Sequence, residues 1–127
     1  MKHPLQLRFS DIDRLGHVTN SVYSQFLDIG RLAYIETYLP ELDFNARTLV
    51  LVRIESDFVH PSLYGEQLYV DTKVERIGTK SVSMRQEIIS AQGEVKCRSL
   101  SIMSTLDQQT GKSFILPEEW KDKLQRE

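Results

Sequence analysis

One long segment of helical periodicity, followed by four segments of alternating character, is the feature that most restricts the fold of this chain. Between residues 20 and 39, apolar residues recur at the three- and four-residue spacing of an α-helix. They form two rows, one of Val22, Phe26, Ile29 and Ala33, the other of Tyr23, Leu27 and Tyr34. Because this apolar face is wide, we expect the helix to be mostly buried. Pro40 ends it, since proline removes a hydrogen-bond donor and clashes with the preceding turn.

Most of the remaining chain alternates with period two, which predicts strands with one buried face. One strand is expected before the helix, over residues 5–10, and four after it, over residues 48–58, 68–74, 82–88 and 95–102. A short helix is expected over residues 117–124. No repeat or linker interrupts residues 1–127, so this order predicts one α+β domain, in which an antiparallel sheet of about five strands wraps around a central helix.

Charge and cysteine usage exclude several classes of protein. The net charge of −2 argues against a dedicated nucleic-acid binder, which normally carries a basic surplus. The single cysteine, Cys97, forms no intramolecular disulfide and no cysteine zinc cluster, and we expect it to be buried. His3, His17 and His60 are too scattered to predict a metal site, and His60 is interpreted as part of a surface turn. With neither a signal-like start nor an apolar run of about 20 residues, a cytoplasmic protein without membrane contact is expected.

Polar groups concentrate between the first predicted strand and the helix. Asp11 and Asp13 lie two residues apart, Gly16 permits a tight bend, and His17 precedes the helix. The first N–H groups of a helix have no intrahelical partner and carry partial positive charge. A carboxylate beside such groups suits acyl hydrolysis, because the N–H groups stabilise an oxyanion while the carboxylate attacks the acyl carbon or activates water. Loop structure and helix capping are the alternative interpretation of the same residues.

Residues 8–23, with Asp13-Arg14-Leu15-Gly16-His17-Val18-Thr19-Asn20 at their centre, resemble a family signature. The signature is that of the hotdog-fold acyl-CoA thioesterases of the 4-hydroxybenzoyl-CoA thioesterase type. Its pattern is Asp-x-x-Gly-His-Val-Asn-Asn and a tyrosine, with an aromatic residue, an acid and an arginine further along the helix, as in Phe26-Leu27-Asp28-Ile29-Gly30-Arg31. The run Gly78-Thr79-Lys80-Ser81 is also similar to a turn of these proteins, and the predicted order of elements extends the resemblance over nearly the whole chain.

The resemblance implies catalytic roles for three residues. Asp13 matches the catalytic carboxylate, whose role is nucleophile or general base, and Asp11 falls on the less decisive position. The backbone N–H of Asn20 matches the group that polarises the thioester carbonyl, and His17 is expected to orient the substrate or Asp13. Thr19 departs from the family's double asparagine, which weakens any substrate-binding role at that position but leaves Asp13 unaffected.

Substrate contacts are expected along the acyl group and, as the resemblance suggests, along the pantetheine arm. They are Gly16, Tyr23 and Phe58 near the acyl group, and Gly78, Lys80 and Ser81 along the pantetheine arm. The phosphates of coenzyme A require basic groups at the rim, and the later strands offer Lys80, Arg85, Lys96 and Arg98. Asp28 and Arg31, three apart on the helix, are interpreted as a structural ion pair.

The predicted function is therefore hydrolysis of an acyl-CoA to a free acid and coenzyme A, without a metal or other cofactor. The resemblance implies a homodimer or homotetramer joined at sheet edges. An acyl-carrier-protein thioesterase and a non-catalytic acyl-CoA binder are the alternatives, although a binder does not require Asp13. A hydratase on the same fold requires a catalytic histidine with an acidic partner, and His17, the one candidate, follows the thioesterase pattern instead.

Overall fold

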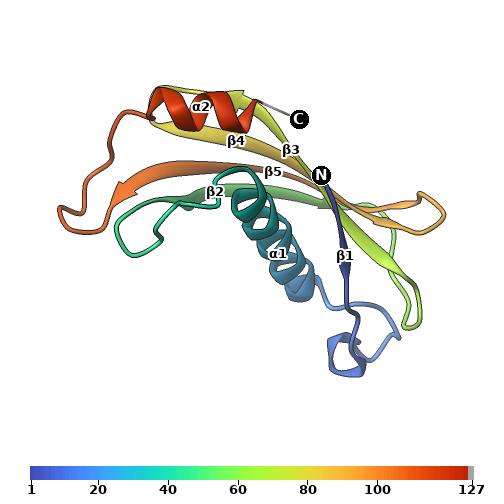
Figure 1. The fold of residues 1–127 in the computed structure, drawn as a ribbon. Helices are drawn as coiled ribbons and strands as arrows, with labels where there is room; N and C mark the ends of the chain where they lie inside the picture. The colour runs from blue at the N-terminus through green and yellow to red at the C-terminus, as the bar shows by residue number, and fades with distance from the viewer. Residues whose placement is uncertain (126–127) are drawn as a thin grey trace.

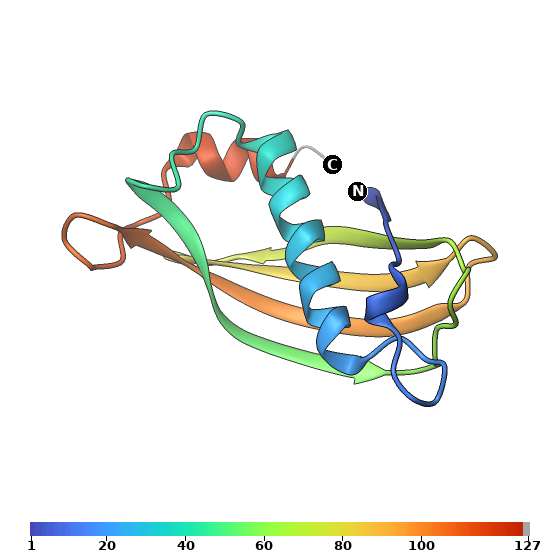
Figure 2. The same cartoon turned by 90° about the horizontal axis from the view of Figure 1, so that it is seen from below.

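The computed structural model describes residues 1–125, which form a five-stranded antiparallel sheet curved around a long helix (Figure 1). The strands follow the order β1-β3-β4-β5-β2 across the sheet. Their bounds are β1 (Lys2–Leu5), β2 (Arg47–Phe58), β3 (Leu68–Ile77), β4 (Ser81–Ser90) and β5 (Val95–Asp107). The helices are η1 (Phe9–Asp11, a single 3₁₀ turn), α1 (Asn20–Tyr38) and α2 (Glu118–Leu124). Figure 2 shows α1 crossing the concave face of the sheet, as the sequence predicts.

The buried face of α1 differs in part from the predicted one. The residues that pack against the sheet are Val22, Tyr23, Phe26, Leu27, Gly30, Arg31, Tyr34 and Ile35. Ile29, predicted to be buried, is 42% exposed, and Leu32 is also exposed. The reason is that the closest approach to the sheet is centred on Gly30, which turns Ile29 to the flank of the helix. The predicted helix bounds and the α2 prediction are confirmed.

Two hydrophobic clusters lie between α1 and the sheet. One surrounds the first half of α1 and includes Phe26, Leu27, Ile88 and Cys97, so the prediction that Cys97 is buried is confirmed. The other surrounds its second half and includes Tyr34, Ile35, Met84, Leu116 and Leu124. A polar seam, formed by Arg31, Thr72 and Gln86, lies under the middle of the helix. The amide of Gln86 donates to Thr72 Oγ1 (3.0 Å) and to the Leu27 carbonyl (2.9 Å), and its oxygen accepts from Arg31 (3.0 Å).

The prediction of a strand over residues 5–10 is wrong. The strand is β1, which ends at Leu5, and residues 9–11 form the 3₁₀ turn η1. The carboxylate of Asp11 accepts from the backbone N–H and the guanidinium of Arg8, both at 2.9 Å, and closes this turn. This local pairing outweighs the apolar alternation, and Phe9 is left 80% exposed.

The sheet ends on one side in a long, exposed edge. β2 pairs with β5 along one side, and no strand among residues 1–125 covers its other side. Residues 51–60 are all exposed, among them Leu51, Val52, Ile54 and Phe58. At the opposite edge, β1 has four residues and contains Pro4. None of the helices in this described part of the chain is long and apolar enough to cross a membrane.

Candidate active site

The loop before α1 holds Asp13 by hydrogen bonds to its own backbone. Asp13 Oδ1 accepts from the N–H groups of Leu15 (2.9 Å) and His17 (3.2 Å), and the Asp13 carbonyl accepts from Gly16 (3.1 Å). Gly16 has a φ of +79°, in the left-handed region where glycine is favoured, so the turn depends on it. Oδ2 has no hydrogen-bond partner within residues 1–125, and the Asp13 side chain is exposed. One carboxylate oxygen therefore fixes the loop and the other remains available for chemistry.

Unpartnered N–H groups lie at the beginning of α1. Thr19 occupies the N-cap position, but its side chain does not cap the helix. The backbone N–H of Asn20 has no acceptor among the described residues. Because helix N-terminal N–H groups carry partial positive charge, this end of α1 can stabilise an oxyanion.

A cavity of about 410 Å³ brings these groups together with the end of β2. Its walls are formed by Asp13, Leu15, His17, Val18, Thr19, Asn20, Tyr23, Phe58, Val59, His60 and Pro61. One half of the wall is the loop before α1 with the beginning of α1, and the other is the chain at the end of β2. Two hydrogen bonds to Ser62 join them, from the N–H of Val18 to the Ser62 carbonyl (2.8 Å) and from the Tyr23 hydroxyl to Ser62 Oγ (2.8 Å). A β-bridge between His17 and Leu63 also joins them. The chain thus builds one pocket from segments about 40 residues apart, as counted from Tyr23 to Ser62.

The predicted acyl-site residues Tyr23 and Phe58 both line this cavity. Tyr23 is 2% exposed and its ring centroid lies 5.7 Å from that of Phe58, which is 51% exposed. Burial raises the pKa of the Tyr23 hydroxyl, so it stays neutral and acts as a wall and a hydrogen-bond donor. His17 also lines the cavity, although its side chain has no hydrogen-bond partner in residues 1–125.

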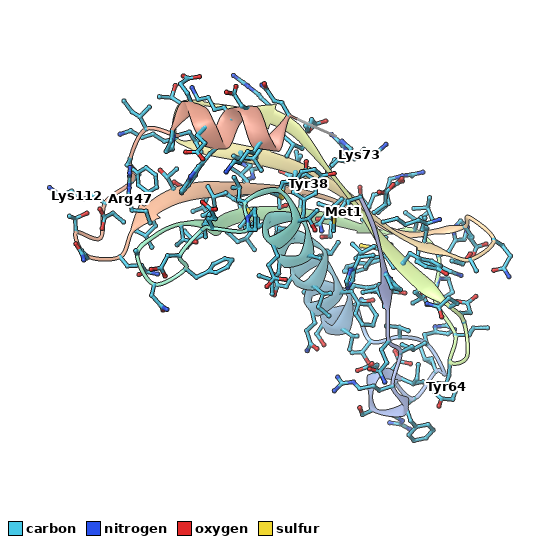
Figure 3. The ribbon with its side chains drawn as sticks, in the orientation of Figure 1. Met1, Tyr38, Arg47, Tyr64, Lys73 and Lys112 are labelled. Atoms are coloured by element: carbon cyan, nitrogen blue, oxygen red, sulfur yellow. The ribbon has the colours of Figure 1, made fainter. Side chains whose placement is uncertain are left out.

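The predicted pantetheine residues lie elsewhere in the chain. Phe58 at the end of β2 pairs with Cys97 of β5, whereas Ser81 at the beginning of β4 pairs with Ser104, also of β5. Cys97 and Ser104 are seven residues apart on β5, so the ends of the strand at which Phe58 and Ser81 lie are about 23 Å apart along an extended strand. Figure 3 shows the same separation: Tyr64, near the pocket, lies at one end of the molecule, and Arg47 and Lys112 lie at the other. Gly78, Lys80 and Ser81 therefore do not meet Asp13 within one chain.

The basic residues considered for phosphate binding are mostly engaged. Lys96 is 2% exposed and pairs with Glu66 and Glu94, so the prediction that it faces a ligand phosphate is wrong. Arg85 pairs with Glu75, and Arg98 pairs with Glu87. Lys80 is exposed and has no ion-pair partner in the described part of the chain, which leaves it as the free candidate of the four.

The carboxylate of Asp11 is structural. It is 2% exposed, it is bound by Arg8, and its backbone carbonyl accepts from the N–H of Thr19 (2.9 Å). At this less decisive position the sequence favours a solvent-facing or a turn-forming carboxylate; the structure contradicts the first of these and confirms the second. The predicted ion pair of Asp28 and Arg31 is also present, with Arg31 buried and Asp28 exposed.

We expect Asp11→Asn to weaken folding while leaving catalysis within about threefold of the wild type, because Asp11 does not line the cavity. The hydrogen bonds from Arg8 lower the pKa of Asp11, so its stabilising effect is complete above the ordinary value near 3.9 and is lost as the pH falls through the lowered pKa. Urea unfolding at pH 7 should show that the free energy of unfolding of the variant is about 1 kcal/mol below that of the wild type. This difference should become smaller in acid. A variant with full stability at pH 7 and a strongly reduced rate would show that Asp11 is the catalytic carboxylate.

Sequence reasoning missed the wall contributed by residues 59–61. The sequence predicts His60 in a surface turn; it is exposed and lies in that turn, but it also lines the cavity opposite the Asp13 loop. The signal that would have identified it is the pairing of this segment with the loop before α1, which the local pattern does not reveal.

Comparison with known proteins supports the fold and identifies the family. A family model described as thioesterase-like superfamily matches residues 7–124. A predicted thioesterase from Bacillus stearothermophilus is 28% identical, with a TM-score of 0.87 over 97% of this chain and 92% of that one. A thioesterase from Thermus thermophilus, solved with coenzyme A and Zn, is 26% identical, with a TM-score of 0.85 over 98% of this chain and 96% of that one.

A more distant structure supports the fold alone. A 1,4-dihydroxy-2-naphthoyl-CoA thioesterase from Synechocystis is 18% identical, with a TM-score of 0.84 over 97% of this chain and 93% of that one. No curated protein matches the sequence. The resemblance found in the sequence and the predicted hotdog architecture are confirmed by these similarities.

Proposed function

The chain belongs to the thioesterase-like superfamily, and from this premise we propose that it hydrolyses acyl-CoA thioesters at the cavity between the Asp13 loop and the end of β2. The predicted thioester hydrolase is confirmed at the level of the superfamily. The observation that carries the proposal is the placement of the Asp13 carboxylate and the unpartnered Asn20 N–H on one cavity wall. A carboxylate and an oxyanion donor are the two groups that thioester hydrolysis needs most.

In the proposed reaction, the thioester carbonyl oxygen accepts a hydrogen bond from the N–H of Asn20. Negative charge that develops on this oxygen is then stabilised by a fixed dipole that needs no rearrangement. Asp13 either attacks the carbonyl carbon or removes a proton from the attacking water, and both roles use its free oxygen Oδ2. His17 is proposed to orient the substrate beside Asp13.

Coenzyme A is the proposed leaving group because the thioesterase from Thermus thermophilus was solved with coenzyme A and is 26% identical. In the present chain, Lys80 is the free basic residue among those considered, but it lies at the end of the sheet away from the cavity. A second copy of the chain can supply a Lys80 at the cavity end of the sheet if the β2 strands of the two copies pair in antiparallel fashion. The turn of one copy, residues 78–81, then lies at the same end of the joined sheet as the cavity of the other, with β5 and β2 of its own copy between them.

A homodimer through β2 is the proposed assembly, and the exposed surface favours it. The unpaired edge presents Leu51, Val52 and Ile54, and Ile29 and Leu32 of α1 are also exposed. Long, apolar edge strands pair readily with other chains, whereas the other edge is short and contains proline. Pairing of two β2 strands would cover apolar side chains of the edge and satisfy the free backbone groups of both copies.

We expect Ile54→Asp to weaken the dimer by at least about tenfold, because a carboxylate at the edge costs free energy when it loses water. Sedimentation velocity over a range of concentrations measures the dissociation constant. The matched control is Lys2→Asp on the opposite edge, which should leave the dimer intact. A wild-type chain that is monomeric and fully active at micromolar concentration would contradict the assembly.

The proposed reaction uses no metal ion. Among residues 1–125 there is no group of three or more His, Cys, Asp and Glu side chains placed to hold a metal. We therefore expect the rate of thiol release to be unchanged after dialysis against EDTA. A rate that falls after dialysis and returns with added Zn²⁺ would contradict this part of the proposal.

The experiment that tests the function is release of free thiol from acyl-CoAs, from acetyl to palmitoyl and including benzoyl and phenylacetyl, followed with a disulfide dye. Burial raises the pKa of the Cys97 thiol to about 11, so the folded protein adds little background. Release from one or more acyl-CoAs is expected. Absence of release while coenzyme A still binds would indicate a non-catalytic binder, and release from acyl-carrier protein alone would indicate a carrier-protein thioesterase.

A further inference from the structure

His60 lies at the cavity on a backbone that is fixed to the sheet. The N–H groups of Val59 and His60 both donate to the carbonyl of Lys96, at 2.9 and 3.3 Å. The next carbonyl, that of Pro61, accepts from Lys96 Nζ at 3.1 Å. Lys96 is itself buried between Glu66 and Glu94, so it anchors the cavity wall rather than binding a ligand. The position of the imidazole relative to the Asp13 loop is therefore well defined.

The ring of His60 is oriented by one hydrogen bond. Its Nδ1 lies 3.1 Å from the carbonyl oxygen of Val95. Because a carbonyl oxygen can only accept, Nδ1 carries a proton in this contact. Nε2 has no hydrogen-bond partner within residues 1–125. His60 lines the cavity, so a ring nitrogen without a protein partner is present there: Nε2 accepts a proton in the neutral ring and donates one in the imidazolium.

Charged groups of both signs lie near His60. The pKa of the Glu94 carboxyl is lowered mainly by the Lys96 ammonium and, to a smaller extent, by His60. A carboxylate therefore lies within electrostatic range of the imidazole. The other ionisable groups of the wall are less suited to donating a proton, since Asp13 is needed as a carboxylate and the Tyr23 hydroxyl donates to Ser62. His17 contributes its backbone N–H to Asp13 and belongs to the opposite wall.

We propose that His60 is a catalytic residue that, as the imidazolium, donates the proton of Nε2 to the sulfur of the departing thiolate and becomes the neutral ring with its proton on Nδ1, a role that rests on the proposed thioester hydrolysis. In the general-base form of the reaction, Asp13 takes a proton from water as the water oxygen bonds to the acyl carbon. The C–S bond then breaks, its electron pair goes to sulfur, and His60 supplies the proton that forms the thiol. The proton held by Asp13 returns to His60 through solvent, so the sum is thioester plus water giving acid plus thiol.

The test compares two leaving groups that carry the same acyl group. One substrate is the acyl-CoA, whose alkyl thiolate is basic and gains from protonation. The other is the acyl thioester of 5-thio-2-nitrobenzoate, whose aromatic thiolate is stable without a proton. For His60→Gln, whose amide can still donate to Val95, we expect kcat to fall by about 10²-fold on the acyl-CoA and by less than about threefold on the aromatic thioester.

The other outcomes of this comparison decide whether His60 is the proton donor. Equal losses on both substrates, or no loss on the acyl-CoA, would overturn the proton-donor role. If the wild type does not accept the aromatic thioester, imidazole added to His60→Ala decides instead: restored hydrolysis of acyl-CoA supports the role, and no restoration overturns it. His3→Gln, outside the cavity, is the control and should match the wild type. If the wild type releases no thiol from any acyl-CoA, the proposed function itself is contradicted. If the wild type and His60→Gln hydrolyse acyl-CoA equally well, only the role of His60 is contradicted.

Discussion

Replacing Asp13 with asparagine should lower kcat/KM for acyl-CoA hydrolysis by about 10²-fold or more, because the amide neither attacks an acyl carbon nor accepts a proton from water. The loop should keep its shape, since the amide oxygen can still accept from the N–H groups of Leu15 and His17. The loss should therefore appear in the rate and not in the melting temperature. Steady-state thiol release and thermal unfolding of the same preparations measure the two effects.

Asp11→Asn is the matched control for this experiment, since it is the same change two residues away, at a buried carboxylate that pairs with the exposed Arg8. The two variants should behave in opposite ways: one loses activity and keeps stability, and the other loses stability and keeps activity. An Asp13→Asn protein with unchanged turnover would remove Asp13 from the mechanism.

Gly30→Ala should destabilise the protein by about 1–3 kcal/mol, although alanine is the better helix former. An added Cβ would lie 2.6 Å from Val70 Cγ2, 2.7 Å from Gln86 Nε2 and 2.9 Å from Thr72 Oγ1. All three side chains are fully buried in the sheet, so α1 has to move away from it or the polar seam has to rearrange. At about 4 °C per kcal/mol, the melting temperature should fall by roughly 4–12 °C at fixed protein concentration.

Ser24→Ala is the control for helix propensity, because Ser24 lies on the exposed side of the same helix. It should leave the melting temperature nearly unchanged or raise it slightly. A Gly30→Ala protein as stable as this control would mean that α1 does not approach the sheet as closely as the structure shows.

The elements of the fold were predictable because their signals are local. The wide apolar face between Asn20 and Tyr38 and the period-two segments after it each reflect burial on one side of an element. The first strand was misplaced because a specific pairing, that of Arg8 with Asp11, overrides the alternation and folds residues 9–11 into a turn. Ile29 was misassigned because the helix rotates to place Gly30 against the sheet, and only the packed structure shows that contact.

The candidate site was predictable in one half and not in the other. Asp13, Gly16 and Asn20 lie within eight residues of each other, so the loop and the helix start form the site locally. The opposite wall, with Phe58 and His60, depends on how β2 ends against β5 and on the hydrogen bonds of Ser62. Such long-range register leaves little trace in the sequence, and an imidazole before a proline has the appearance of an ordinary turn.

The central claim is that the thioester carbonyl lies at the beginning of α1, between the N–H of Asn20 and the side chain at position 13. The most direct test is a crystal structure of Asp13→Asn with an intact acyl-CoA bound. The account predicts a carbonyl oxygen about 3 Å from the backbone nitrogen of Asn20, with the acyl carbon beside the side chain at position 13. An acyl-CoA whose carbonyl lies away from α1, with Asn20 still unpartnered, would contradict the account.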